Sequence, residues 1–515
     1  MSTTTTNDFF KTNVLGHPAG LFVLFFTEMW ERFSYYGMRA LLVIFLVSTY
    51  DKGGWEWTTE RAMSLYGTYT MGVYLTPVLG GLIADRLLGY RWAVVIGAFI
   101  MTMGHASMAI ETPLFLYIGL GCLIIGNGLF KPNMTSMISN LYKDHPEKKD
   151  GAYSIFYMGV NAGAFLGIML CGYIGEKVSW SWGFGLAGIF MFLGMLQFYF
   201  TQNIFGEVGL SAKKQKELTK DKPKEEDNTP TKIIVDRMIV VLIFSVFTVF
   251  FWAAFEQAGG SMTIFADKYT QRVLEGNAGL TFKIVDTILT IVPLAIISYV
   301  LIKLFSQTFK KYSIGNLILS LSFIVIWGIV LWKINREFSS ENAEVPATWF
   351  GILNSLFIIA FAPLFSKWWE SKYNLPGAVK FGLGLILLGL GFGFLAYGSQ
   401  AIVSGADDIV RVSMVWLILA YLFHTLGELC LSPVGLSYVS KLVPASWIGM
   451  MFGVYYLFIA MGNKAAGSMG GMIEKITEEY SLTTFFLIFT IVPVAMGLLI
   501  TALNPLIKKL MHGVK

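Results

Sequence analysis

The sequence is poor in charged residues, and this scarcity limits the kind of protein that it can encode. Asp, Glu, Lys and Arg together make up 14% of its 515 residues, whereas a soluble globular domain carries about 25%. Hydrophobic residues make up 55%, and apolar runs of about 18 residues or more recur along the chain. These features exclude an ordinary soluble protein and predict an all-α polytopic membrane protein.

Cysteine is also scarce, and neither sign of charge is in strong excess. The three cysteines, Cys122, Cys171 and Cys430, all fall inside apolar segments, which indicates packing rather than a disulfide framework or a metal site. The net charge is only +5 and the basic residues gather in short loops. This pattern is typical of membrane orientation and not of nucleic-acid binding.

The apolar runs predict fourteen membrane-spanning helices. We place them at residues 20–49, 60–87, 90–110, 113–141, 151–176, 183–204, 237–259, 283–307, 313–334, 347–368, 377–399, 411–440, 447–470 and 482–507. Residues 206–236, between the sixth and seventh spans, are rich in lysine and acidic residues and contain two prolines. They predict a solvated linker that separates an N-terminal six-helix bundle, residues 1–205, from a C-terminal bundle, residues 237–515.

Lysine and arginine are unevenly distributed between alternate loops. The richer set contains the linker and the loops with Arg86/Arg91, Lys143/Lys148/Lys149, Lys310/Lys311, Lys367/Lys372 and Lys508/Lys509. By the positive-inside rule this side is cytoplasmic, and an even number of spans then places both termini there. The N-terminal segment has no cleavable leader, so we expect the first helix to be the retained insertion signal. The short loops favour a bacterial inner membrane.

The first predicted helix carries four charged residues in an otherwise apolar run. Glu28, Glu31 and Arg32 lie at i, i+3 and i+4, so they share one helix face, and Arg39 returns to nearly the same face about three turns later. Four ionised groups near the middle of a bilayer would cost on the order of 10 kcal/mol unless they face one another, water or a substrate. We therefore expect this helix to line a polar cavity.

The arrangement of spans resembles the major facilitator superfamily, whose members have twelve core helices in two six-helix bundles. The loop after the second span, residues 81–91, matches the cytoplasmic loop motif of that superfamily. The resemblance implies that Asp85 and Arg86 form a conformational latch; the alternative is a positively charged loop with a turn glycine. Two of the fourteen helices are then additional, and we assign them to about 283–334, where intramembrane charges are few.

The charged stretch of the first helix closely resembles the E-x-x-E-R-F-x-Y-Y-G signature of the proton-coupled oligopeptide transporter (POT) family, a branch of that superfamily. Every fixed position is present in residues 28–37. Further matches follow in the expected order of helices: Tyr74 in Tyr-Leu-Thr-Pro, residues 126–133, 156–163 and 251–257, Asn354, and residues 427–435. Gly67 aligns with a histidine of animal members, so the chain is similar to bacterial members, in which carboxylates carry the coupling.

The resemblance implies a proton-coupled symporter that imports di- and tripeptides by alternating access, functions as a monomer in the lipid bilayer and needs no cofactor. It implies proton-coupling roles for Glu28, Glu31, Arg32, Lys131, Glu256 and Glu428. It implies peptide contacts for Arg39, Tyr35, Tyr36, Tyr74, Lys131, Asn161, Asn354, Glu428, Trp252 and Tyr455. Arg39 and Lys131 would hold the peptide carboxylate, and Asn161, Asn354 and Glu428 its amino group.

The distribution of charge is consistent with these roles. The first half contributes cations and the second half contributes the carboxylates of Glu256 and Glu428, so a pocket between the halves would complement a short zwitterion. An arginine can bind a carboxylate through two hydrogen bonds, which fixes the direction of the peptide. If Lys131 or Arg32 leaves a glutamate to bind substrate, the proton affinity of that glutamate rises, and proton and peptide binding favour each other.

Structural alternatives stay open for these residues. Glu28, Glu31 and Arg32 could form a static ion-pair network, and Lys131 could extend to the membrane interface. Glu256, near the external end of its helix, is interpreted as a gating or coupling residue. The three tyrosines, Trp252 and Tyr455 could be packing aromatics, Glu428 could be purely structural, and His105 and His424, outside the motifs, are expected to be hydrogen-bonded packing residues.

Besides Gly67, the sequence departs from the family pattern at two further points. Tyr455 occupies a position usually held by tryptophan, and the extra helix pair follows the seventh core helix instead of interrupting the linker. A relative that moves another small zwitterionic or anionic solute is the alternative within transport. An enzyme is not expected because no serine-nucleophile, zinc-protease or paired-aspartate motif stands in a suitable setting, and no repeated pore motif indicates a channel.

Overall fold

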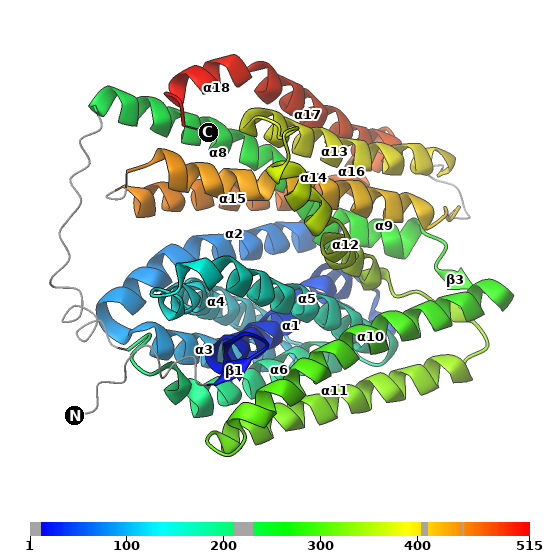
Figure 1. Ribbon diagram of the computed structural model, residues 1–515. Helices are drawn as coiled ribbons and strands as arrows, with labels where there is room; N and C mark the ends of the chain where they lie inside the picture. Colours follow the sequence, from blue (N-terminus) through cyan, green and yellow to red (C-terminus); the bar gives the residue numbers. More distant parts are fainter. Residues whose placement is uncertain (1–11, 211–229, 403–409, 445–446, 515) are drawn as a thin grey trace. The chain divides into compact units, whose positions relative to one another are not determined.

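The computed structural model describes residues 12–210, 230–402, 410–444 and 447–514. Most of the predicted linker, residues 211–229, lies outside these ranges. Within them the chain is mainly helical (Figure 1). The long helices are α1 (Ala19–Val47), α2 (Thr59–Ile83), α3 (Tyr90–Met108), α4 (Pro113–Leu141), α5 (Lys149–Lys177), α6 (Trp180–Thr201), α8 (Thr231–Phe255), α10 (Gly276–Thr308), α11 (Ser313–Ser339), α12 (Ile352–Glu370), α13 (Gly377–Gly398), α14 (Val415–Leu442), α15 (Ile448–Gly470) and α17 (Leu482–Ala502).

Each predicted span corresponds to one of these long helices. The greatest extension is in α10, which begins at Gly276 instead of residue 283 and has 33 residues. The helical path that begins with α8 continues through a 3₁₀ turn (Glu256–Gly259) into α9 (Ser261–Tyr269). Two further short helices are α16 (Ile473–Glu479) and α18 (Asn504–Leu510).

In the described ranges, four two-residue strands form two small antiparallel pairs. Strands β1 (Asn13–Val14) and β2 (His17–Pro18) precede α1. Strands β3 (Val273–Leu274) and β4 (Ala343–Glu344) pair with Val273 opposite Glu344. The second pair therefore closes the base of the hairpin formed by α10 and α11.

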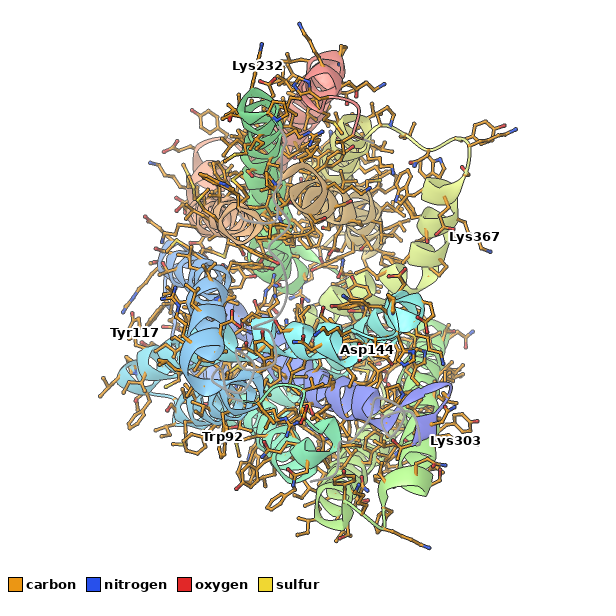
Figure 2. All side chains as sticks on the ribbon, turned by 60° about the vertical axis from the view of Figure 1, so that its left-hand side comes forward. Trp92, Tyr117, Asp144, Lys232, Lys303 and Lys367 are labelled. Carbon is orange, nitrogen blue, oxygen red and sulfur yellow. The ribbon has the colours of Figure 1, made fainter. Side chains whose placement is uncertain are left out.

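Eleven helical segments in the described ranges are long and apolar enough to cross a membrane. Helix α1 is not among them, because every 18-residue stretch of it contains at least three of its four charged residues. Aromatic residues such as Trp92 of α3 and Tyr117 of α4 are 50% and 48% exposed and point outwards (Figure 2). This apolar exterior is expected where lipid surrounds the helices.

The chain divides into two compact units. Unit 1 contains residues 1–41, 76–222 and 272–349, and unit 2 contains residues 42–75, 223–271 and 350–515. The division cuts α1 after Leu41 and α2 before Thr76. This division does not test the predicted six-helix bundles, residues 1–205 and 237–515, and they stay a prediction.

Helix α5 lies unusually close to α1 in unit 1. Gly159, Gly163 and Gly167 recur every four residues on α5, and a Cβ built on Gly163 would lie 2.2 Å from the Met29 carbonyl oxygen and 2.9 Å from Arg32 Cβ. Without a hydrophobic driving force between helices in lipid, such small residues allow two backbones to approach. The glycines thus place the charged turn of α1 directly against α5.

The α10–α11 hairpin packs against α6 in unit 1. Phe323 of α11 contacts Trp30 of α1, with ring centroids 5.7 Å apart. Asp286 of α10 and Lys333 of α11 form a buried ion pair, with Lys333 Nζ 2.7 and 2.8 Å from the two carboxylate oxygens. Lys333 also lies 4.3 Å from the ring centroid of Trp349, so its charge is enclosed by an anion and an aromatic face.

Unit 2 is organised around α13, which packs against α14 and α17, and α8, which packs against α15. The first part of α2 belongs to this unit, where a Cβ on Gly67 would lie 2.8 Å from Gly467 Cα of α15. The C-terminal segment lies beside the start of α8, because His512 Nε2 is 2.6 Å from Asp236 Oδ2.

Candidate transport site

The charged turn of α1 forms a compact ion-pair cluster in unit 1. Arg32 Nε lies 3.1 Å from Glu28 Oε1, and the same nitrogen donates a short hydrogen bond to Glu31 Oε2. All three side chains are buried, with Glu31 completely inaccessible. One guanidinium therefore contacts two carboxylates, as the i, i+3, i+4 spacing predicted.

The cluster is not fully satisfied. Glu28 Oε2 and Arg32 Nη2 are buried without a hydrogen-bond partner among the described residues. A buried polar atom without a partner is costly, and a carboxylate oxygen in this position can accept a proton without breaking an existing hydrogen bond. This geometry is better suited to proton exchange than a fully bonded static network would be.

Helix α4 contributes an amide and a cation to the cluster. Asn127 Nδ2 donates to Glu31 Oε1 at 3.2 Å, and Lys131, one turn later, interacts electrostatically with Glu28, Glu31 and Arg39. Sequence reasoning gave Asn127 no role, although it lies at i−4 from Lys131 and hence on the same helix face. This spacing is the feature of the sequence that could have identified Asn127 as a site residue.

Two tyrosines lie between the glutamates and Arg39 along α1. The Arg32 guanidinium is 5.3 Å from the Tyr35 ring centroid, and the Arg39 guanidinium is 5.8 Å from the Tyr36 centroid. The two rings meet edge to face with centroids 5.0 Å apart. The guanidinium groups of Arg32 and Arg39 therefore each lie over the ring of a tyrosine on the same helix.

Asn161 is buried on α5, in the stretch that packs against α1. Its Nδ2 donates to the Tyr157 carbonyl oxygen of its own helix at 2.9 Å. In the described part of the chain this is the only hydrogen bond of the Asn161 side chain. No other predicted site residue orients Asn161, so its contact with a peptide amino group stays a prediction.

A second polar group lies in unit 2, between α12 and α14. Asn354 Nδ2 donates to Glu428 Oε2 at 2.9 Å and lies 3.1 Å from Thr425 Oγ1. The predicted pair Asn354 and Glu428 is therefore brought together, and Thr425, one turn before Glu428, was missed. A carboxylate positioned by an amide in this way can accept hydrogen bonds from an ammonium group.

Glu256 lies where α8 ends, and its carboxylate is buried. The Tyr66 hydroxyl of α2 donates to Glu256 Oε2 at 3.0 Å. Tyr66 was not among the predicted site residues, because no local pattern connects positions 190 residues apart. The bond joins a residue of the first sequence half to one of the second half within unit 2.

The remaining predicted aromatics are in unit 2. Tyr74 and Trp252 have ring centroids 6.0 Å apart. Tyr455 is buried, and its hydroxyl accepts a hydrogen bond from Thr248 Oγ1 at 3.3 Å. A Cβ on Gly435 would lie 1.9 Å from this hydroxyl, so the tyrosine is packed tightly against the α14 backbone.

The predicted latch residues lie in a π-helical turn, Ala84–Leu88, at the end of α2. Asp85 and Arg86 are exposed there, and the turn ends at Gly89, whose φ of 76° favours glycine. Arg91 was not assigned to the latch, yet its guanidinium binds the carbonyl oxygens of Val208 and Gly206 at 2.7 and 2.5 Å. This motif therefore ties the start of α3 to the segment after α6.

The expectation that His105 and His424 are hydrogen-bonded is wrong. Both ring nitrogens of the buried His424 lack a hydrogen-bond partner among the described residues, and the same holds for His105. His105 is completely buried in α3, but neither of its ring nitrogens has a hydrogen-bond partner in the described ranges. It is a packing residue without the expected hydrogen bonds. The reason is its surroundings, since the small Gly188 of α6 approaches its Cβ and offers no polar side chain.

The chain resembles known proteins over nearly its whole length. The family profile described as "PTR2: POT family" matches residues 91–221 and 322–486, more than half of the chain. The chain is 30% identical over 537 residues to "Peptide transporter YePEPT" of Yersinia enterocolitica subsp. palearctica serotype O:3 (strain YE-P4), covering 99% of this chain and 98% of the relative. It is 28% identical over 512 residues to the "Di-/tripeptide transporter" of Lactococcus lactis subsp. cremoris, covering 97% and 98%.

The fold is also similar to a solved structure. The crystal structure titled "peptide transporter POT in complex with sulfate" matches with a TM-score of 0.75 at 28% identity, covering 99% of both chains. This match, with the long helices described above, confirms the predicted all-α membrane fold of the major facilitator type.

Proposed function

The chain belongs to the POT family, and from this membership and the geometry of its charged groups we propose that it is a proton-coupled symporter that imports di- and tripeptides by alternating access. Members of the family are transporters, so the chain is a transporter and not an enzyme. The relatives from Yersinia and Lactococcus are named as transporters of peptides and of di- and tripeptides, which supports peptides as the substrate here.

The observation that carries the proposal is the cluster of Glu28, Glu31 and Arg32. A static ion pair in an apolar helix is of little use to stability, because desolvation offsets much of the attraction between the charges. Four charged residues on α1, with a carboxylate oxygen of Glu28 that has no hydrogen-bond partner among the described residues, are explained by a function that moves charge. Intramembrane ionisable residues commonly belong to such proton pathways.

Recognition of the peptide is assigned to charges at both of its ends. Arg39 and Lys131 bind the carboxylate, and the Glu428 carboxylate, oriented by Asn354, binds the ammonium group. Asn161, Tyr35, Tyr36, Tyr74, Trp252 and Tyr455 complete the contacts. Contacts directed at the ends and the backbone of a peptide tolerate many side chains, so broad specificity for short peptides is expected.

Coupling follows from competition for the same cations. When a peptide carboxylate draws Lys131 away from the glutamates, they lose a positive neighbour and bind a proton more readily. Binding of one ligand then favours binding of the other. One charge moved across 100 mV provides about 2.3 kcal/mol, which corresponds to roughly a 50-fold peptide gradient.

The setting of this activity is a bacterial inner membrane, with both chain termini in the cytoplasm and a monomer as the functional unit. The basic loops support this orientation. In it the glutamates of α1 lie nearer the cytoplasm than Arg39, so the proton site is below the peptide site. Asp85 and Arg86, exposed at the cytoplasmic end of α2, act as the latch.

The direct test is uptake of labelled dialanine into proteoliposomes with an imposed inward proton gradient. Uptake above that of protein-free liposomes, abolished by an uncoupler, is expected. Uptake that ignores the uncoupler, or no uptake at all, would contradict the proposal. A dialanine analogue blocked at both ends serves as the substrate control and should not accumulate.

The coupling role is tested separately with Glu28→Gln and Glu31→Gln. Both variants should lose gradient-driven uptake but retain part of the peptide counterflow exchange, which needs no net proton movement. Equal loss of both activities would instead assign the cluster a structural role.

A further inference from the structure

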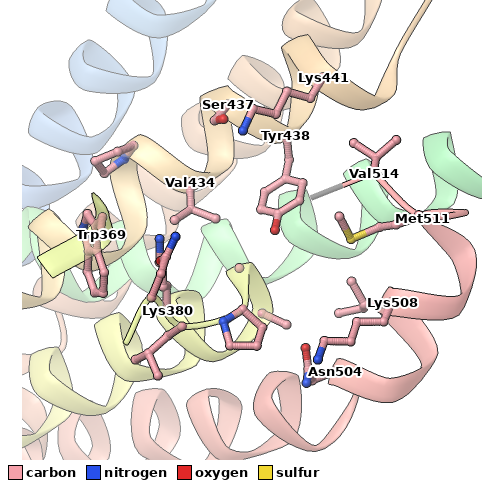
Figure 3. Close-up of a pocket in the computed structure, with 18 residues that line it drawn as sticks. Trp369, Lys380, Val434, Ser437, Tyr438, Lys441, Asn504, Lys508, Met511 and Val514 are labelled. Atoms are coloured by element: carbon pink, nitrogen blue, oxygen red, sulfur yellow. The ribbon is translucent and has the colours of Figure 1, made fainter. Parts of the chain in front are cut away.

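Unit 2 contains a cavity that none of the proposed transport residues lines. It has a volume of about 660 Å³ and lies where the segment before α13, the end of α14 and the C-terminal helix α18 meet (Figure 3). A volume of this size is typical of small-molecule sites, which range from about 300 to 1,000 Å³. Under the proposed orientation this end of unit 2 is cytoplasmic.

The cavity is lined by cations from three helices. Lys380 comes from α13, Lys441 from α14 and Lys508 from α18, and Figure 3 shows the three side chains approaching from different sides. No acidic residue is among the described residues that line it. Lys380 and Lys441 are close enough to repel each other, so a bound anion would lower the electrostatic energy of the site.

Uncharged hydrogen-bond donors add to the preference of the cavity for an anion. Trp369 Nε1 is buried and has no hydrogen-bond partner among the described residues, and its ring lies 4.3 Å from Lys380 Nζ. Helix α13 begins at Gly377 in the cavity wall, and the first N–H groups of a helix carry partial positive charge. Asn374 and Asn504 add side-chain amides.

The rest of the wall is apolar. Leu375, Pro376, Val434, Ile507 and Met511 line the cavity beside the lysines. Apolar surface next to clustered ammonium groups suits an amphiphile with an anionic head, and basic pockets between membrane helices on the cytoplasmic side are known to bind lipid phosphates. Lysine ammonium groups bind phosphate oxygens as point charges.

We propose that this cavity binds a phosphate-bearing anion, supplied either by the headgroup of an acidic membrane lipid or by the cytosol. The site is separate from the peptide and proton residues, so it is a further binding activity of the chain. Its residues come from three separate stretches of the sequence, residues 369–380, α14 and residues 504–514. Occupancy would therefore hold α13, α14 and α18 together.

The membrane source is tested with purified full-length protein in nanodiscs of phosphatidylcholine containing a minor fraction of phosphatidylglycerol. Native mass spectrometry counts the lipids that stay bound. The intact chain should retain phosphatidylglycerol over phosphatidylcholine. Lys380→Gln and Lys508→Gln should each lower this retention about fivefold, the effect of one lysine at an anionic surface. Trp369→Phe, which replaces the indole by a smaller ring without an N–H donor, should lower it less.

Lys509→Gln is the matched control, because Lys509 follows Lys508 in the sequence and is exposed like it, but does not line the cavity. It should leave retention unchanged. The soluble source is tested by titrating inorganic phosphate and glycerol 3-phosphate into detergent-purified protein while its thermal unfolding is followed. Stabilisation that Lys380→Gln and Lys508→Gln abolish and Lys509→Gln preserves would identify the cytosol as the source.

The proposal is supported if the cavity variants, but not Lys509→Gln, lose lipid retention or lose stabilisation by soluble phosphate. The experiment in which this loss occurs identifies the source of the phosphate. The proposal is overturned if neither probe binds, or if Lys509→Gln affects binding as much as the cavity variants do. Dialanine uptake by the same purified proteins, reconstituted into proteoliposomes, together with their thermal unfolding, shows whether the variants are folded, and it distinguishes failure of this site from failure of the transport proposal.

Discussion

Asn127 of α4 donates a hydrogen bond to Glu31 of α1, with 3.2 Å between Nδ2 and Oε1. This bond connects the signature of the first helix to the helix that carries Lys131. It makes Glu31, completely buried, a shared acceptor for an amide and for Arg32. The orientation of the proposed proton site therefore depends on a residue whose own side chain cannot titrate.

Asn127→Ala should reduce proton-driven uptake more than counterflow exchange. The substitution leaves a buried carboxylate oxygen without its donor, which costs about 1–3 kcal/mol and disturbs the proposed proton site, which counterflow does not need for net proton movement. Uptake and counterflow of dialanine measure the two activities. Asn133→Ala is the control, because Asn133 donates within its own helix, to Leu129. A deficit of equal size in both variants would contradict the role of Asn127.

Arg39→Ala should weaken binding of a dipeptide about tenfold, because a hydrogen bond to a charged group is lost. Binding of the same dipeptide with an amidated C-terminus should change little, since it has no carboxylate for Arg39 to hold. Competition against labelled dialanine gives both affinities. If both ligands weaken equally, another residue holds the carboxylate, and Lys131→Gln is then the variant to compare.

Tyr66→Phe should lower the thermal stability of the protein, because it removes the hydroxyl that donates to the buried Glu256. Glu256→Gln should be milder, since an amide oxygen still accepts that hydrogen bond. Melting temperatures in detergent of the two single variants and of the double variant Tyr66→Phe/Glu256→Gln together form a double-mutant cycle. Additive effects of the two substitutions would show that the hydroxyl and the carboxylate do not interact.

Asp286→Asn should destabilise the α10–α11 hairpin strongly, because it leaves the buried Lys333 without its counter-ion. Removing one partner of a buried pair typically costs about 3–5 kcal/mol, whereas replacing both by apolar residues is often neutral. The double variant Asp286→Leu/Lys333→Met should therefore recover most of the lost melting temperature. Lys303→Met, on the exposed side of α10 (Figure 2), is the control and should have little effect.

The contact between α16 and α2 should depend on pH through Glu474. Burial raises the pKa of this carboxyl, but the hydrogen bond from Thr59 Oγ1 at 2.6 Å and the Lys268 ammonium at 3.1 Å outweigh it and hold the pKa below its ordinary value of 4.5. A lowered pKa in the folded state stabilises the protein above pH 4.5, and this contribution is lost as the pH falls through the folded-state value.

Glu474→Gln should therefore lower the melting temperature slightly at pH 7, and the difference from the unaltered chain should shrink on acidification below pH 4.5. The effect is small because the pair is exposed to solvent. Glu478→Gln, on the same helix, is the control. A difference between Glu474→Gln and the unaltered chain that is constant from pH 7 to pH 3.5 would exclude the ionised carboxylate as its cause.

The sequence by itself determined the class of fold, the number and approximate ends of the long helices, and the charged face of α1. These properties are local: hydrophobic runs mark spans, and residues at i, i+3 and i+4 meet on one helix face whatever surrounds them. The family signature at residues 28–37 was readable for the same reason, as was the proximity of Glu28, Glu31 and Arg32.

Only the tertiary structure decided which helices supply partners to those residues. Asn127 for Glu31, Tyr66 for Glu256 and Thr425 for Asn354 are pairings across sequence separations of 96, 190 and 71 residues, and no periodicity encodes them. The lysine-lined cavity in unit 2 arises in the same way, from three helices that meet at one end. Contacts of this kind depend on how helices pack, and packing is set by complementary surfaces rather than by any single stretch of sequence.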